Sequence, residues 1–252
     1  MAFARPMHNI IAELLASMKQ NVLADNKCYF GGGTAIVLSL GEYRQSLDVD
    51  FLCADIDGYR ELRNGFFEAR GIGSLFPGSV KLLRDVHADA TSVRLLLEFR
   101  EQRIKFEIVR EARIELAGEP HPTLVVPTLS VRDMFAEKLL ANSDRCFDRS
   151  VAYRDAIDLG HLVAAYGGLD GSAVAKAEHA YGPDILRKMT GVLNLLLEKK
   201  EVRHAAHVLD MDYERTVEVI EGLRQAARKT WPGSGIENDP DAEGRSDRDD
   251  RL

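Results

Sequence analysis

Two aspartates separated by one apolar residue, Asp48 and Asp50, are the side chains in this sequence best suited to chemistry. Alternate side chains of a β-strand point to the same face, so both carboxylates are expected to lie side by side while Val49 and Phe51 enter an apolar layer. Carboxylates so close repel each other unless a cation lies between them. Mg²⁺ accepts one or two carboxylates together with phosphate oxygens and water, so the pair predicts a site for Mg²⁺, or for Mn²⁺, that also receives a phosphorylated substrate.

A glycine-rich segment before the aspartates predicts where the phosphates bind. Residues 28–40 are expected to form a strand, a tight turn of three glycines and a short helix. Such a turn presents backbone N–H groups and a helix N-terminus to an anion, and glycine lets a triphosphate approach the main chain because it has no Cβ. Either feature alone indicates only a turn or a solvated strand, whereas their order along the chain indicates a nucleotide site. The groups expected to hold the phosphates are Gly32, Gly33, Thr34, Arg44 and Ser46.

A third carboxylate, Glu107, is a candidate for the same site. Residues 94–98 and 103–110 are expected to form two strands, and alternation places Glu107 on the face opposite Phe106 and Ile108. There it could bind a metal ion or activate a substrate hydroxyl. An ion pair with an arginine of a neighbouring strand explains the residue equally well.

Two helices downstream carry charged residues at helical spacing. Lys138, Ala141 and Arg145 share one face of the first helix, which leaves room for a ligand over the small side chain. Asp155 and Asp158 share one face of the second helix. A pairing of Lys138 with Asp155 across the two helices is the simpler structural explanation of these residues.

Taken together, these motifs resemble the nucleotidyltransferase superfamily that includes DNA polymerase beta, and specifically the AbiEii-type toxin family. The resemblance covers about residues 27–160 and includes KLLANSDR at 138–145 and RDAIDL at 154–159. It implies that Lys138 contacts the nucleotide phosphates, that Arg145 and Asp158 also belong to the nucleotide site, and that Asp155 acts near the reacting hydroxyl. It departs from the wider superfamily at Gly33, where serine is common.

The resemblance implies a metal-dependent enzyme that moves a nucleotide from a nucleoside triphosphate to an acceptor hydroxyl and releases pyrophosphate. It further implies an RNA acceptor, in particular the 3′ end of tRNA, and a growth-arresting toxin restrained by a separately encoded antitoxin. Two alternatives are transfer to a small molecule or a protein side chain, and a non-catalytic binding protein on the same fold. The intact acidic pair counts against the second alternative, because a binding scaffold has little reason to keep two repelling carboxylates.

The fold class expected for the chain is α+β. Residues 1–127 are expected to form an N-terminal helix and a nucleotidyltransferase-type mixed sheet with flanking helices. Residues 128–231, where apolar residues recur at helical spacing, are expected to form a helical domain that completes a substrate cleft. Residues 232–252 are polar and acidic, which predicts a disordered tail.

Composition is that of a soluble globular protein, with 252 residues of which 45% are hydrophobic and 29% charged. No apolar run reaches the roughly 18 residues needed to cross a membrane, and the first residues lack the apolar core of a signal peptide, so a cytoplasmic protein is expected. Three cysteines without paired spacing indicate buried thiols in a reducing compartment. The net charge of −7 does not exclude RNA, because the last twenty residues alone hold seven acidic and three basic side chains.

Overall fold

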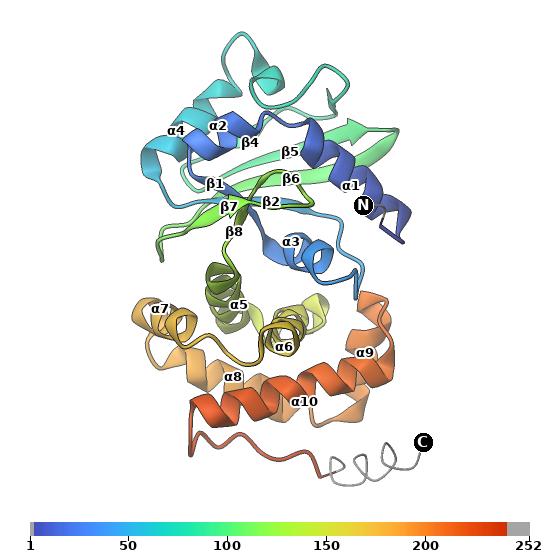
Figure 1. The fold of residues 1–252 in the computed structure, drawn as a ribbon, viewed down its shortest axis with the longest axis vertical. Coiled ribbons are helices and arrows are strands. Elements are labelled where there is room, and N and C mark those ends of the chain that lie inside the picture. The colour runs from blue at the N-terminus through green and yellow to red at the C-terminus, as the bar shows by residue number, and fades with distance from the viewer. Residues whose placement is uncertain (1–2, 241–252) are drawn as a thin grey trace. The chain divides into compact units, whose positions relative to one another are not determined.

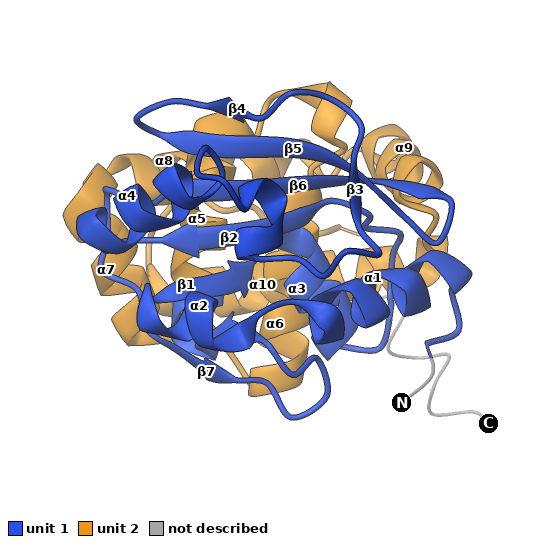
Figure 2. Cartoon of the chain, turned by 90° about the horizontal axis from the view of Figure 1, so that it is seen from above, with its two compact units in different colours: residues 1–134 blue, residues 135–252 orange. Residues whose placement is uncertain are grey.

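The computed structural model describes residues 3–240 and divides the chain into two compact units, Met1–Met134 and Phe135–Leu252 (Figure 2). The division falls inside helix α5 (Val131–Arg145), later than the boundary expected after residue 127. Residues 241–252, the larger part of the tail expected to be disordered, lie outside the described residues.

Unit 1 contains a mixed sheet with strand order β3-β5-β6-β2-β1-β8-β7, and β4 pairs with β5 (Figure 1). Its strands are β1 (Cys28–Gly31), β2 (Val49–Cys53), β3 (Lys81–Leu82), β4 (His87–Ala88), β5 (Ser92–Phe99), β6 (Gln102–Arg110), β7 (Gly118–Pro120) and β8 (Pro127–Leu129). Strands β2 and β6 are parallel, whereas β1 with β2 and β5 with β6 are antiparallel. This mixed sheet confirms the α+β fold class.

The helices of unit 1 lie on both faces of the sheet. They are α1 (Pro6–Ser17), α2 (Gln20–Asp25), α3 (Gly32–Ser39) and α4 (Ile56–Gly65), with a 3-10 helix at Gly71–Ser74. In both views α1, α2 and α4 lie on one face and α3 on the other (Figures 1 and 2). The single N-terminal helix expected from the sequence is broken between α1 and α2, because Met18 is extended and the Lys19 N–H donates to the Leu75 carbonyl.

Aromatic side chains hold together the three strands that matter for the site. The rings of Phe30 and Phe51 are 5.4 Å apart, and those of Phe51 and Phe106 are 5.5 Å apart. All three are fully buried. Since a slip of one residue would turn these rings to the opposite face, this apolar row fixes the pairing of β1, β2 and β6.

Unit 2 is helical from α5 to the end of α10 at Thr230. After α5 it contains a 3-10 helix at Arg149–Val151, α6 (Arg154–Tyr166), α7 (Gly171–Tyr181), α8 (Asp184–Leu195), α9 (Lys199–Leu209) and α10 (Tyr213–Thr230). Helix α6 packs closely against α10, where a Cβ on Gly160 would overlap the Val219 carbonyl oxygen. Among the helices of residues 3–240, none combines the length and apolar character needed to cross a membrane.

Residues 232–240, which follow α10, contact the helices of unit 2, and the disorder expected of the tail stays a prediction. Ile236 is buried, and the Glu237 N–H donates to Asn194 Oδ1. The guanidinium of Arg224 is almost completely buried and donates to the carbonyls of Leu193 and Glu237 at 2.7 and 2.9 Å. A buried guanidinium needs such acceptors, and residue 237 supplies one.

Candidate nucleotide site

Strand β1 passes directly into helix α3, without the separate three-glycine turn expected from the sequence. Gly31 is both the last residue of the strand and the N-cap of the helix. Gly32 begins the helix with a φ of +67°, a conformation that glycine adopts without steric cost. The first N–H groups of a helix have no acceptor inside it, so this junction offers main-chain donors to an anion.

Three side chains lie directly against the two glycines that begin α3. A Cβ on Gly32 would lie 2.8 Å from Oδ2 of Asp50. A Cβ on Gly33 would overlap the Arg44 guanidinium and would lie 3.4 Å from Oγ of Ser46. The structure therefore brings Gly32, Gly33, Arg44, Ser46 and Asp50 together, and it does so because the glycines have no side chains.

Thr34 turns its hydroxyl to neighbouring protein groups. Its Oγ1 donates to the Asp48 carbonyl at 2.5 Å and lies 2.8 Å from Oγ of Ser46. A hydroxyl has one proton, so Thr34 must accept the hydrogen bond from Ser46. Thr34 is 1% exposed. In this arrangement it fixes the segment that precedes β2.

The two aspartates flank the first residue of β2. The strand begins at Val49, so Asp48 precedes it, and only Asp50 lies within the strand as expected. Val49 and Phe51 are fully buried, whereas Asp48 is exposed and Asp50 is partly exposed. Asp50 pairs in register with Gly31 on β1 and with Glu107 on β6.

Glu107 lies beside Asp50 in the sheet, but its carboxylate has an arginine partner. Arg94, opposite it on β5, donates from Nε to Oε1 of Glu107 at 2.7 Å. The ion pair with an arginine of a neighbouring strand, which was the alternative explanation of Glu107, is therefore present. Within residues 3–240 no three His, Cys, Asp or Glu side chains are gathered as for a metal ion, and a metal-binding role of Glu107 stays a prediction.

Unit 2 brings the charged residues of α5 and α6 together in one buried cluster. Lys138 Nζ lies 2.8 Å from Oδ1 of Asp155 and 2.6 Å from Oδ2 of Asp158. Arg145 donates to both oxygens of Asp155, at 2.6 and 3.0 Å. The pairing of Lys138 with Asp155 that the sequence offered as the simpler explanation is thus observed.

This cluster makes Asp155 a poor proton acceptor. Burial alone would raise the pKa of its carboxyl, but the charges and hydrogen bonds of Lys138 and Arg145 hold that pKa well below the usual range. Both carboxylate oxygens already accept hydrogen bonds. Asp155 is therefore better suited to orient the two cations than to remove a proton.

His8, which no sequence motif indicated, contacts the segment between α3 and β2. Its ring is fully buried and lies 2.7 Å from a carboxylate oxygen of Glu42. Its spacing from Ile11 and Leu15 places it on the buried face of α1. A histidine on an otherwise apolar helix face was the signal available.

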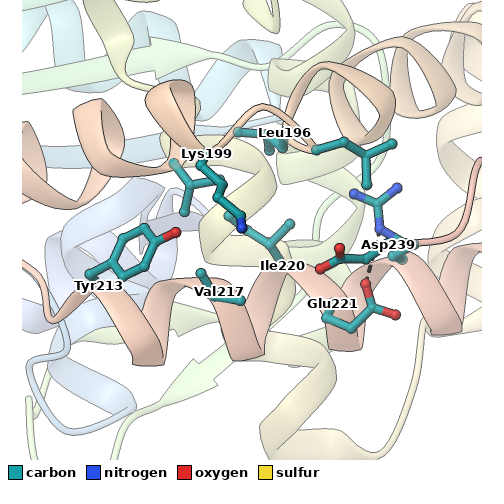
Figure 3. A pocket seen from close by; sticks show the side chains of 10 residues that line it. Leu196, Lys199, Tyr213, Val217, Ile220, Glu221 and Asp239 are labelled. Carbon is teal, nitrogen blue, oxygen red and sulfur yellow. Dashed lines mark hydrogen bonds and ion pairs between the residues drawn. The ribbon is translucent and has the colours of Figure 1, made fainter. Parts of the chain in front are cut away.

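A hollow in unit 2 is lined by other residues (Figure 3). The labelled side chains are Leu196, Lys199, Tyr213, Val217, Ile220, Glu221 and Asp239. None of the residues that line it belongs to the site predicted from the sequence. The candidate chemistry therefore lies elsewhere in the described residues.

Comparison with known proteins identifies the family. The family model described as nucleotidyl transferase AbiEii toxin, type IV toxin–antitoxin system, matches residues 13–231. A candidate nucleotidyltransferase from H. pylori has a TM-score of 0.50 and 19% identity, covering 88% of this chain and 94% of that chain. JHP933 from Helicobacter pylori has a TM-score of 0.49 and 18% identity, covering 99% of this chain and 98% of its own. No curated protein matches the chain.

At 19% identity the first of these structures shows a likeness of fold alone. The family model is the stronger finding, because it spans most of the chain and includes the glycine–aspartate segment and both charged helices. The chain therefore belongs to the AbiEii family of nucleotidyltransferase toxins of type IV toxin–antitoxin systems, and it is a nucleotidyltransferase.

Proposed function

We propose that this protein transfers a nucleotide from a nucleoside triphosphate to a hydroxyl at the 3′ end of tRNA, as a toxin restrained by a cognate antitoxin. The observation that carries the proposal is the placement of Asp50, Arg44 and Ser46 against the glycines at the start of α3. This places a carboxylate, a guanidinium and a hydroxyl around one helix N-terminus, which is the combination needed for a metal-bound triphosphate.

The triphosphate would be held by main-chain and side-chain donors of unit 1. The N–H groups at Gly32 and Gly33 would bind phosphate oxygens, since they begin a helix. The Arg44 guanidinium beside Gly33 would add a charged donor. Thr34 would act indirectly, because its hydroxyl is already bonded to Asp48 and Ser46.

The residues present fit a divalent cation. Carboxylate oxygens are the ligands that Mg²⁺ and Mn²⁺ prefer, and the missing side chain of Gly32 leaves space beside Oδ2 of Asp50. Asp48 and Asp50 would therefore hold the ion, with phosphate oxygens and water completing its ligands. When bound, such an ion neutralises charge that develops on the phosphates during transfer.

Glu107 is our candidate for the group that accepts the proton of the attacking hydroxyl. It lies in register with Asp50 on the neighbouring parallel strand. Its ion pair with Arg94 is partly exposed, so the carboxylate is less constrained than that of Asp155. Within unit 2, Asp155 and Asp158 would instead orient Lys138 and Arg145, whose part in the nucleotide site stays a prediction.

A transfer assay tests the proposal directly. Each of the four labelled nucleoside triphosphates is incubated with purified tRNA, with and without Mg²⁺, and then with total RNA, protein and small-molecule extracts. We expect labelled tRNA that requires a divalent ion and disappears in Asp48→Asn and Asp50→Asn. Label found only in protein or in small molecules would exclude the RNA acceptor.

Growth of cells that express the protein tests the biological role. Wild-type protein is expected to arrest growth, and Asp50→Asn at equal expression is expected to allow it, because the arrest would require catalysis. Equal arrest by both proteins would favour a non-catalytic binding function on the same fold.

A further inference from the structure

We propose that His8 and Glu42 are positioning residues that hold the 41–48 loop, between α3 and β2, in the conformation that binds the triphosphate. This loop carries Arg44, Ser46 and Asp48, so the inference rests on the proposed function of those residues. His8 belongs to α1, and neither His8 nor Glu42 is expected to touch the nucleotide.

His8 joins two points of the loop through its two ring nitrogens. Nδ1 lies 2.7 Å from Oε1 of Glu42, and Nε2 lies 3.4 Å from the backbone nitrogen of Ser46. The Ser46 N–H can only donate, so Nε2 must be the unprotonated acceptor and Nδ1 must carry the proton given to Glu42. The contacts therefore specify one neutral tautomer of His8, which fixes the direction of both hydrogen bonds.

Glu42 fastens the beginning of the loop to the beginning of α1. Its carboxylate accepts from the backbone N–H groups of Ala4 at 2.6 Å and Arg5 at 3.1 Å, in addition to His8. Burial would raise the pKa of this carboxyl, but these three donors lower it below its ordinary value. The Glu42 N–H donates to the Val37 carbonyl at 2.9 Å, which also ties the loop to the end of α3.

The backbone at Glu42 has a conformation that is unfavourable unless other contacts stabilise it. Its φ is +60°, in the left-handed region that disfavours residues with a side chain. Such a conformation persists where surrounding contacts determine it, and the three donors to the carboxylate are such contacts. The loop is therefore shaped by long-range bonds to α1.

Ser46 connects His8 to the proposed phosphate ligands. His8 accepts a hydrogen bond from the backbone N–H of Ser46, and Thr34 accepts one from the Ser46 hydroxyl. The main chain and the side chain of Ser46 are therefore held by two different residues. Thr34 also holds the Asp48 carbonyl. Loss of the His8 contact should release the loop around Arg44 and Ser46 and weaken triphosphate binding. Asp50 and Glu107 stay in place because they belong to β2 and β6, and Asp48 stays because Thr34 still bonds its carbonyl.

Two substitutions of His8 separate its contacts. The amide of Gln reaches the position of Nε2, so His8→Gln can keep the contact with Ser46, whereas the shorter His8→Asn can keep only the contact with Glu42. The measurements are hydrogen exchange of residues 41–48 without nucleotide, and KM and kcat for the triphosphate. We expect faster exchange and about a tenfold higher KM in His8→Asn, with kcat within about twofold, and values near wild type in His8→Gln.

A matched control comes from the same unit. The Tyr59 hydroxyl donates to the Asp89 carbonyl at 2.9 Å, so Tyr59→Phe removes one hydrogen bond away from the loop. This variant should leave loop exchange and KM unchanged. Glu42→Gln provides a second probe if His8→Asn does not fold, because an amide cannot accept from all three donors, and a KM about threefold higher is expected.

The outcomes distinguish this inference from the proposed function. The inference is overturned if hydrogen exchange of the loop is unchanged in His8→Asn. If that variant is unfolded, unchanged exchange in Glu42→Gln overturns it. A fall in kcat with unchanged KM also overturns it. If the loop exchanges faster as expected but wild-type protein uses no triphosphate, the proposed function fails while the structural role of His8 stands. Nitrogen chemical shifts of the His8 ring that show a protonated Nε2 would also overturn the inference.

Discussion

The Nζ atom of Lys138 lies 2.8 Å from Oδ1 of Asp155, and both side chains are almost completely buried. Breaking such a pair leaves a cation without its full complement of acceptors. We expect Asp155→Asn to lower the free energy of unfolding by about 3 kcal/mol at neutral pH. Urea unfolding checks this, with Asp144→Asn as the control, because Asp144 is an exposed aspartate on α5, the helix of Lys138. A loss below about 1 kcal/mol in Asp155→Asn would contradict the energetic role of the cluster.

The same cluster predicts how stability depends on acid. The pKa of Asp155 is lower in the folded protein than the value of about 3.9 expected in the unfolded chain. Its ionised form therefore stabilises the fold above that value, and the contribution is lost as the pH falls below it toward the folded pKa. Urea midpoints measured from pH 6 downward should fall more steeply for wild type than for Asp155→Asn. Parallel curves would show that another group is responsible.

Glu107→Gln separates catalysis from stability. If Glu107 accepts the proton of the attacking hydroxyl, kcat should fall by about a hundredfold or more. Because the ion pair with Arg94 is partly exposed, the free energy of unfolding should change by less than about 1 kcal/mol. Arg94→Ala is the matched variant, which removes the same ion pair and keeps the carboxylate. An equal kcat for Glu107→Gln and wild type would show that another group accepts the proton of the attacking hydroxyl.

Gly32→Ala tests the close approach of Asp50 to the start of α3. The new Cβ would lie 2.8 Å from Oδ2 of Asp50, on a residue whose φ is +67°. We expect a loss of about 1–2 kcal/mol from the left-handed backbone, together with loss of transfer activity as the carboxylate is displaced. Gly71→Ala is the control, because Gly71 has a φ of +52° and nothing within 4 Å of its Cβ position. Similar activity in both variants would argue against a site at this junction.

Tyr153→Phe tests a polar contact that no sequence motif indicated. Its hydroxyl donates to Oε2 of Glu201 at 2.6 Å. Burial is the larger cause, and the Glu201 carboxylate the smaller, of a pKa of Tyr153 that is raised to about 12. Because the folded pKa exceeds that of the unfolded chain, wild type should lose stability as the pH rises from about 10 toward that value. Urea midpoints of Tyr153→Phe should lack this alkaline loss, whereas those of Tyr166→Phe, at a half-exposed tyrosine, should retain it.

Local sequence patterns predicted the elements that depend on local physics. Alternation around Asp50 predicted that Val49 and Phe51 are buried, and they are, because a strand with one buried face enforces that pattern. Helical spacing predicted that Lys138 and Arg145 share a face, and the structure gives them a common partner in Asp155. The α+β class followed from the same periodicities.

Contacts between distant residues could not be predicted in this way. Helical spacing places His8 on the buried face of α1, but it does not show that Glu42 and Ser46 are its partners. The composition of residues 232–240 indicates disorder, yet Arg224 provides a donor that holds the carbonyl of Glu237. Such partners depend on the tertiary fold, which the composition of a segment does not reveal.

The register that places Gly31, Asp50 and Glu107 side by side joins three strands, the last of which follows a long intervening segment of chain. A nascent polypeptide that has not yet extended beyond β6 therefore lacks Glu107, one of the acidic groups that we propose to act in transfer. If Glu107 has the role proposed for it, a truncated translation product that ends before β6 would lack transfer activity.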